Sequence, residues 1–171
     1  IRREAWERFQ SLEPPSGREE HWRYTDLKLI SPEDYSNSGA NVAGTPERIP
    51  DKAREALALA GTASAGEIVH VDGQRFSLSL SDEARRARVI LTDMESAASE
   101  HASLLKPRLA SLIGASDLYT SWNLALHRGG TFLYVPPEVE LSMPLQSLHW
   151  LNASGSAVQP RTVIIVDRGA N

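Results

Sequence analysis

The fold of this chain is decided by residues 123–145, which read NLALHRGGTFLYVPPEVELSMPL. The paired glycines Gly129 and Gly130 are typical of the end of a helix. The apolar run at 131–135, closed by Pro136, predicts a short strand. A second strand is predicted by apolar residues that alternate with polar ones, namely Val139, Leu141, Met143 and Leu145. A helix, a glycine stop and two strands in this order predict that a stacked β-architecture begins here.

The composition narrows the classes of protein that the chain can belong to. Its 171 residues include 41% hydrophobic and 23% charged residues, with a net charge of −4, so nothing favours electrostatic binding to nucleic acid or to an anionic membrane. The absence of cysteine excludes disulfides, thiolate metal ligands and cysteine nucleophiles within this chain. No apolar run approaches the ~20 residues of a membrane span. We therefore expect a cytoplasmic protein without membrane or nucleic-acid partners.

Both ends of the sequence fall inside predicted structure. The first residues, 1–12, already follow a helical pattern, and the apolar strand predicted at 162–166 is followed by only five residues. We expect the sequence to be a fragment of a longer protein.

The region before residue 115 predicts helices around a small hairpin. Asp51 is placed to cap a helix at 52–60, and Asp72-Gly73 between two apolar runs predicts a β-hairpin of 67–71 and 76–80. A third short strand is expected at 88–91. Thr92 and Glu95 have the spacing of a capping box, which would open a helix that continues to Pro107. Residues 36–50, rich in Ser, Asn, Gly and Pro, predict a loop.

The region after residue 115 predicts one helix followed only by strands. Ser116 or Asp117 opens the helix. A shift in the phase of alternation at Leu148 and Trp150 predicts a bulge or corner near Ser147. We expect residues 1–115 to form a mainly helical α/β region with a small hairpin, and residues 116–171 to begin a second, β-rich domain.

Four motifs give the chain a resemblance to a known family. They lie at residues 20–27 (EHWRYTDL), at 69–73 (VHVDG), within 123–145, and at 161–170. In order and spacing they resemble the SufB/SufD family of iron–sulfur cluster assembly proteins, and the first is most similar to SufD. The chain departs from the family pattern at Pro137-Glu138, where lysine and glycine are usual, and at 119–122. The resemblance covers nearly the whole chain, as the amino-terminal portion of a longer member.

The resemblance implies a fold and a role. It implies that this α+β region leads into the first coils of a right-handed parallel β-helix. It also implies a non-enzymatic scaffold subunit of a SufBCD complex, which contacts a SufB-like paralogue and a SufC-like ATPase through the full-length protein. The fragment itself would bind no cofactor, since the iron–sulfur cluster is the product of the complex. The cluster-assembly residues of the family lie later in the β-helix than Asn171.

The candidate site residues have both a functional and a structural interpretation. Trp22, Arg23, Tyr24 and Thr25 combine residue types that are enriched in interface hot spots, but we favour the interpretation that they pack this segment onto its own domain. Asn123 is interpreted as a partner for backbone groups where the helix meets the first strand. No catalytic or metal site is predicted.

The remaining polar residues favour ordinary structural roles. The five histidines have no metal-ligand spacing. Glu138 and Glu140 could share a cation on one strand face, although a solvated face is the simpler interpretation. The five histidines of the chain are His21, His70, His101, His127 and His149.

A rival hypothesis is a carbohydrate-active β-solenoid enzyme. It requires paired carboxylates on one solenoid face, for which the strand region offers only Glu138, Glu140 and Asp167. A truncated β-helix would also expose a strand edge, so we expect homodimers that pair through residues 131–166.

Overall fold

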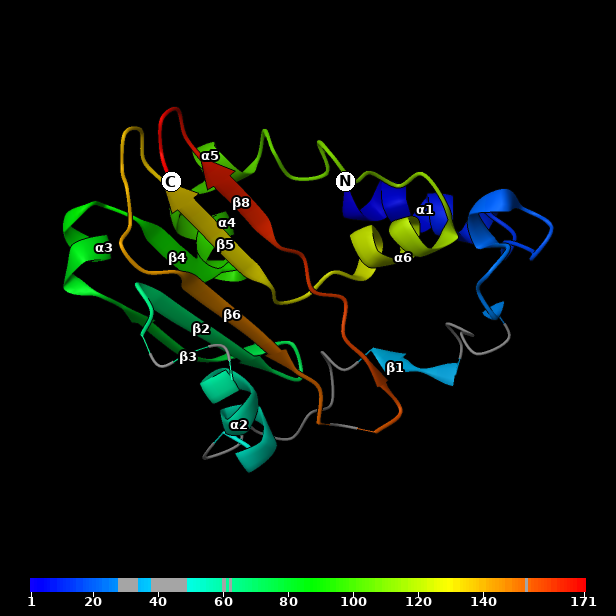
Figure 1. Cartoon of the computed structure of the whole chain (residues 1–171). Helices are drawn as coiled ribbons and strands as arrows, with labels where there is room; N and C mark the ends of the chain where they lie inside the picture. The colour runs from blue at the N-terminus through cyan, green and yellow to red at the C-terminus, as the bar shows by residue number, and fades with distance from the viewer. Residues whose placement is uncertain (28–33, 38–48, 60, 62, 153) are drawn as a thin grey trace.

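The computed structural model describes residues 1–27, 34–37, 49–59, 61, 63–152 and 154–171 (Figure 1). Most of the loop predicted at 36–50 and the end of the helix predicted at 52–60 lie outside these residues. The described part is a mixed α/β structure in which two three-stranded sheets are surrounded by short helices.

The first sheet is built on the predicted hairpin. Strands β2 (Gly66–Val71) and β3 (Gln74–Leu80) pair antiparallel around Asp72-Gly73. Both turn residues have positive φ, 50° for Asp72 and 80° for Gly73, as a tight two-residue hairpin turn requires. Strand β6 (Leu145–Trp150) then adds to the other edge of β2 in parallel, which gives the order β3-β2-β6.

The second sheet joins the strand predicted before residue 92 to one strand that precedes β6 and one that follows it later in the sequence. Strand β4 (Ile90–Asp93) pairs antiparallel with β5 (Thr131–Val135), and β5 pairs in parallel with β8 (Val163–Val166). A third, two-stranded sheet pairs β1 (Ser36–Asn37) with β7 (Ser156–Ala157) in parallel. Strands β5, β6, β7 and β8, consecutive along the chain, therefore extend three different sheets before β8 returns to β5.

The helices cover the ends and one face of this arrangement. Helix α1 (Arg2–Ser11) packs against α6 (Leu118–Leu126), and Phe9 stacks on Trp122 with ring centroids 6.4 Å apart. Helix α2 (Asp51–Leu59) lies next to β6, and α3 (Asp82–Arg86) connects β3 to β4 (Figure 1). A one-turn 3-10 helix, η1 (Glu20–Trp22), follows α1.

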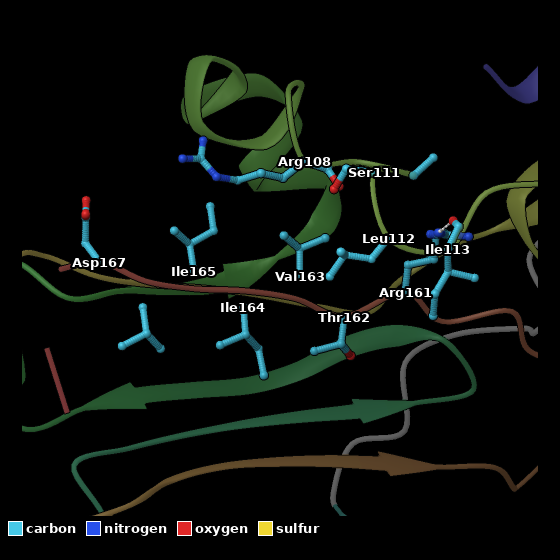
Figure 2. Close-up of a pocket in the computed structure, with 12 residues that line it drawn as sticks. Arg108, Ser111, Leu112, Ile113, Arg161, Thr162, Val163, Ile164, Ile165 and Asp167 are labelled. Carbon is cyan, nitrogen blue, oxygen red and sulfur yellow. Dashed lines mark hydrogen bonds between the residues drawn. The ribbon is translucent and has the colours of Figure 1, made fainter. Parts of the chain in front are cut away.

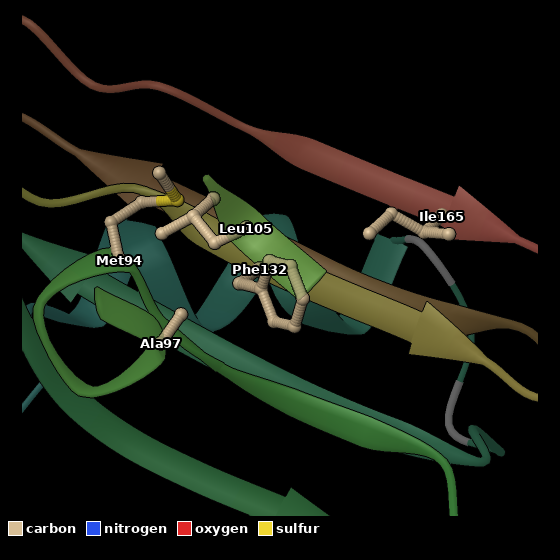
Figure 3. Close-up of a cluster of buried hydrophobic side chains, with 5 residues drawn as sticks. All are labelled: Met94, Ala97, Leu105, Phe132 and Ile165. Carbon is tan, nitrogen blue, oxygen red and sulfur yellow. The ribbon is translucent and has the colours of Figure 1, made fainter. Parts of the chain in front are cut away.

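The core of the second sheet lies between β5, β8 and two short helices, α4 (Met94–Glu100) and α5 (Ala102–Leu105). Figure 3 shows Phe132 of β5 between the side chains of these helices and Ile165 of β8. The cluster consists of Met94, Ala97, Leu105, Phe132 and Ile165. Because β8 contributes to it, the returning strand is fixed by side-chain burial as well as by its hydrogen bonds to β5.

Gly130 is required where α6 gives way to β5. Its φ is +106°, and a Cβ at this position would overlap the backbone of Arg161. The chain that leads into β8 can approach β5 this closely because residue 130 has no side chain.

The second strand predicted within 123–145 is wrong in its extent, because residues 138–144 form no strand and β6 begins only at Leu145. Pro136, Pro137 and Pro144 lack backbone donors, and Glu138 has a φ of +58°. The alternation instead describes burial, since Val139, Leu141 and Leu145 pack against the core of Ala65, Ala84, Val89 and Val135.

Two further local predictions are wrong. The capping box of Thr92 and Glu95 does not form: Asp93 caps α4 by accepting from the Ser96 amide at 2.8 Å. Glu95 instead accepts from the Gly129 amide at 2.9 Å, which ties α4 to the loop before β5. The helix predicted to continue to Pro107 is interrupted at His101, which has non-helical backbone angles.

The bulge predicted near Ser147 is also wrong, because β6 pairs with β2 in continuous register from residue 145 to residue 150. The irregularity lies in the β2–β3 ladder, between Val69 and His70. At the start of α6 the predicted opening of the helix at Asp117 is confirmed: the Asp117 carboxylate accepts from the Thr120 amide, and the Thr120 hydroxyl accepts from the Asp117 amide.

The division into two regions near residue 115 stays a prediction, and each three-stranded sheet contains strands from both sides of it. None of the helices in the described ranges is both long enough and apolar enough to cross a membrane.

We expect Phe132→Ala to lower the free energy of unfolding by about 3–5 kcal/mol, because it leaves a cavity beneath both α4 and α5. Phe132 is fully buried, whereas Leu59, at the end of α2, is 89% exposed and provides the control Leu59→Ala. Urea unfolding followed by circular dichroism measures both variants. Equal losses for the two variants would contradict this assignment of the core.

Candidate assembly surface

A groove of about 420 Å³ runs along the outer edge of β8 (Figure 2). One wall is the segment that follows α5, from Arg108 to Ile113, and the other is β8 with the residues that lead into it. In the described part of the chain the order β4-β5-β8 leaves β8 at the edge of its sheet, so its outer backbone groups face this groove. An edge strand of this kind can pair with an additional strand.

Apolar side chains surround this edge. Along β8, Val163 and Ile165 point toward the helices, while Ile164 points to the opposite side (Figure 2). Ile164 and Val166 are 61% and 53% exposed, although they lie beside Leu133 and Val135 in register. Across the groove, Leu112 is 97% exposed. Exposed aliphatic side chains on both faces of an unpaired edge indicate a contact surface.

Arg161 and Asn123 fix the inner end of the groove. Arg161 donates from Nη1 to the Asn123 Oδ1 at 2.8 Å and from Nη2 to the Ile113 carbonyl at 2.6 Å. The Asn123 amide nitrogen lies 3.4 Å from both the Gln159 side chain and the Pro160 carbonyl. Burial lowers the pKa of Arg161 from its ordinary value. These bonds join α6, the segment after α5 and the entry to β8.

Asn123 bonds to one backbone carbonyl, that of Pro160, which lies before β8 and not where the helix meets the first strand. Arg161 was not recognised as its partner from the sequence. The two residues are 38 positions apart, and only the return of β8 to β5 brings them together. No local pattern could have signalled this pair.

The WRYT segment is not among the residues that line the groove, and it contacts α6 one turn before Asn123. Trp22 packs on Tyr119 of α6, with ring centroids 5.1 Å apart. Arg23 lies over the Tyr24 ring at 5.5 Å and near Glu20 at 3.7 Å, while Tyr24 is 89% exposed. The Thr25 amide donates to the Trp22 carbonyl and closes the turn. The structure therefore separates the four residues into an anchored Trp22 and an exposed Tyr24.

The carboxylates of the strand region do not form a paired site. Glu138 lies in a loop and pairs with Arg168 at 3.4 Å, and Asp167 accepts from the Tyr134 hydroxyl at 3.2 Å. Glu138 and Glu140 do not lie on a strand, so the shared strand face considered for them is absent. Within the described ranges, no group of three or more His, Asp or Glu side chains is arranged to hold a metal ion.

The Asp72-Gly73 turn has a second role that the sequence did not reveal. The Asp72 carboxylate accepts from the Asn152 amide at 2.7 Å, and the Asp72 amide donates to the Trp150 carbonyl at 2.9 Å. The tip of the hairpin therefore holds the chain as it leaves β6 and directs it toward β7.

Comparison with known proteins gives one consistent result. A family model described as "SufBD protein N-terminal region" matches residues 1–147. Proteins named "Iron-sulfur cluster assembly SufBD family protein" from Staphylococcus aureus (strain USA300) and Staphylococcus haemolyticus (strain JCSC1435) are 31% and 32% identical to this chain over 124 residues. These alignments cover 72% of this chain and 25% of each relative. The chain thus spans about a quarter of the length of these curated relatives.

We expect Trp22→Ala to lower the free energy of unfolding by about 1–3 kcal/mol, because it removes the aromatic contact with Tyr119. Tyr24→Ala is the matched control, since it removes a neighbouring aromatic side chain that is 89% exposed. Thermal unfolding of both variants separates the two residues. If Trp22→Ala leaves stability unchanged and reduces partner binding instead, the segment is a docking patch.

Proposed function

This chain belongs to the SufBD family of iron–sulfur cluster assembly proteins, and we propose that it is part of a SufD-type scaffold subunit that supports cluster assembly through protein–protein contacts. The observation that carries the proposal is the family match over residues 1–147, which includes the WRYT segment, the hairpin and the strands up to β6. The family membership expected from the four motifs is confirmed. The assignment to SufD rests on the WRYT segment.

We also propose that β5 to β8 are the first coil of a right-handed parallel β-helix. Val163 follows its parallel partner Phe132 by 31 residues, a spacing that one coil of three short strands and their turns would fill. Parallel addition of β6 to β2 supports the same stacking on a second face. The right-handed sense is the one expected for a connection between parallel strands of one sheet.

In this proposal the fragment closes the amino-terminal end of the β-helix. The hairpin β2–β3 and the strand β4 occupy the edges on which a preceding coil would otherwise lie. On the opposite edges, β6 and β8 have no further strand paired with them among the described residues. Closing one end protects the stacked strands from adding a foreign strand there.

The partners that we propose are those of the family. A full-length subunit would pair with a SufB-like paralogue and bind a SufC-like ATPase in the cytoplasm, with ATP hydrolysis carried out by the ATPase. The iron–sulfur cluster would be the cargo of the complex rather than a resident cofactor of this fragment. The role of this fragment is then to hold the start of the β-helix in place.

The test is copurification of the tagged full-length protein from its own cells. We expect an ATPase and a SufB-like paralogue to copurify with it, and deletion of its gene to lower the activity of iron–sulfur enzymes under iron limitation. Enzymes without a cluster, assayed in the same extracts, are the control. Normal iron–sulfur enzyme activities in the deletion strain would count against the scaffold role.

We expect the 171-residue chain to self-associate through the open edge of β8, and Ile164→Lys to shift it toward monomer at least several-fold. A lysine on this edge places a charge where a second β8 would pair. Leu59→Lys adds the same charge at an exposed position of α2 and serves as control. Sedimentation at increasing concentration measures the shift, and a wild-type chain that stays monomeric throughout would contradict the expectation.

A further inference from the structure

Two histidines that the sequence separates widely are stacked on each other in the first sheet. His70 of β2 and His149 of β6 are direct partners in the parallel register. Their rings are 4.5 Å apart between centroids and inclined by only 2°. This contact lies on the ladder that attaches β6 to the hairpin, so anything that separates the two rings acts directly on that attachment.

Hydroxyl groups connect the two rings to a third strand. The Nε2 of His70 lies 3.2 Å from the Thr131 Oγ1, which lies 2.7 Å from the Ser147 Oγ. The Ser147 hydroxyl is in turn 3.3 Å from the Nε2 of His149. A closed set of four side chains therefore joins β2, β5 and β6. Each hydroxyl can donate or accept, so the set accommodates neutral imidazoles.

The surroundings of His70 do not favour a charged ring. The residue is completely buried, and its Nδ1 has no hydrogen-bond partner among the described residues. A second proton would have to sit on this nitrogen or compete for the Thr131 hydroxyl. Burying a charge without a partner is costly, so protonation of His70 opposes the packed arrangement.

The charged groups around the pair compensate one another. Asp93 of β4 and Arg75 of β3 form an ion pair at 2.7 Å, so the carboxylate whose charge acts on His70 already has a cation. Thr131 is the facing group from β5, and it does not titrate. Helix α2, which packs next to β6, carries exposed charges that do not act on either imidazole; they are Asp51, Lys52, Arg54 and Glu55.

The pKa values follow from this setting. The pKa of His70 is lowered from 6.5 to about 4, chiefly by burial and also by the neighbouring His149 and Arg75, while Asp93 acts in the opposite direction. Burial also lowers the pKa of His149. For Asp93, burial alone would raise the pKa, but hydrogen bonds from Ser96 and the charge of Arg75 outweigh it, and the pKa lies below its ordinary value.

We propose that the stacked His70–His149 pair is a proton-sensitive lock, which holds β6 on β2 while both rings are neutral and releases this pairing when the protein is acidified. The two rings can stay stacked at 4.5 Å when neutral, but two imidazolium ions at that separation repel each other. Among the described residues, the carboxylate whose charge acts on His70 is that of Asp93, and Arg75 already pairs with it.

The sign of the pH dependence is fixed by the direction of the shifts. A histidine whose pKa is lower in the folded state than in the unfolded state binds more protons when unfolded. Its contribution to stability is complete above pH ~6.5 and is lost as the pH falls toward about 4. Between pH 7.5 and 4.5, the shift of His70 alone predicts an increase of the unfolding equilibrium constant on the order of 70-fold.

The test compares urea unfolding of the protein with that of His149→Phe at a series of pH values from 7.5 to 4.5. Phenylalanine keeps a ring that can stack but cannot be charged, so we expect the acid-induced increase to fall several-fold in this variant. His21→Phe is the matched control, because His21 is exposed in η1, and it should behave as the wild type. Equal acid sensitivity of His149→Phe and wild type would overturn the proposal.

A second measurement does not depend on how the variant folds. In the wild-type protein, the nuclear magnetic resonance signals of the His70 ring should titrate well below pH 6, together with loss of the β6 amide signals. A midpoint for His70 near the ordinary value of 6.5 would overturn the lock, as would β6 amide signals that persist unchanged after His70 has become charged.

Discussion

The rest of the structure depends on two parallel pairings between strands that are distant in sequence. β2 accepts β6, and β5 accepts β8, so that each early strand becomes the template for a later one. Neither pairing can be closed by a tight turn, because parallel strands require a long connection. The connections are therefore held by side-chain interactions at particular points: Asp72 directs the chain out of β6, and Arg161 and Asn123 position it before β8. The entropy lost in closing these long connections opposes both pairings, and these contacts help to offset it.

The elements that the sequence predicts correctly are those whose signals are local. Asp72-Gly73 requires positive φ at both positions, and this fixes the hairpin. Ser116 or Asp117 is predicted to open α6 from its position directly before the helical pattern, and Asp117 is the residue that caps it. The strand at 163–166 follows from a run of four β-branched residues. In each case the conformation of a short segment is determined by the residues of that segment itself.

The predictions that are wrong depend on partners from elsewhere in the chain. The alternation after Val139 has the period of a strand, but prolines remove donors and Asn171 pairs with the backbone at 139 and 141, so the segment packs as a loop. Glu95 has the spacing of a cap residue but bonds to the Gly129 amide, 34 residues away. The histidine pair could not be seen at all, because it requires the register of β6 on β2. A pair of side chains on two neighbouring strands can be recognised only when the order and register of those strands are known.

The parallel pairing of β8 with β5 leaves one face of β8 covered by helices and the other face exposed. On the helix side, Ile165 is buried and Val163 is half-buried against the cluster that includes α4 and α5 residues, although both also line the groove. On the other side, Ile164 and Val166 continue the rows begun by Leu133 and Val135 without a cover among the described residues. His149 likewise continues the row begun by His70, but it is exposed where His70 is buried. Val135 and His70 are buried and Leu133 is half-buried, whereas their partners on the later strands, Val166, His149 and Ile164, are exposed. In both sheets, therefore, the strand added last carries the outward row that the described residues leave uncovered.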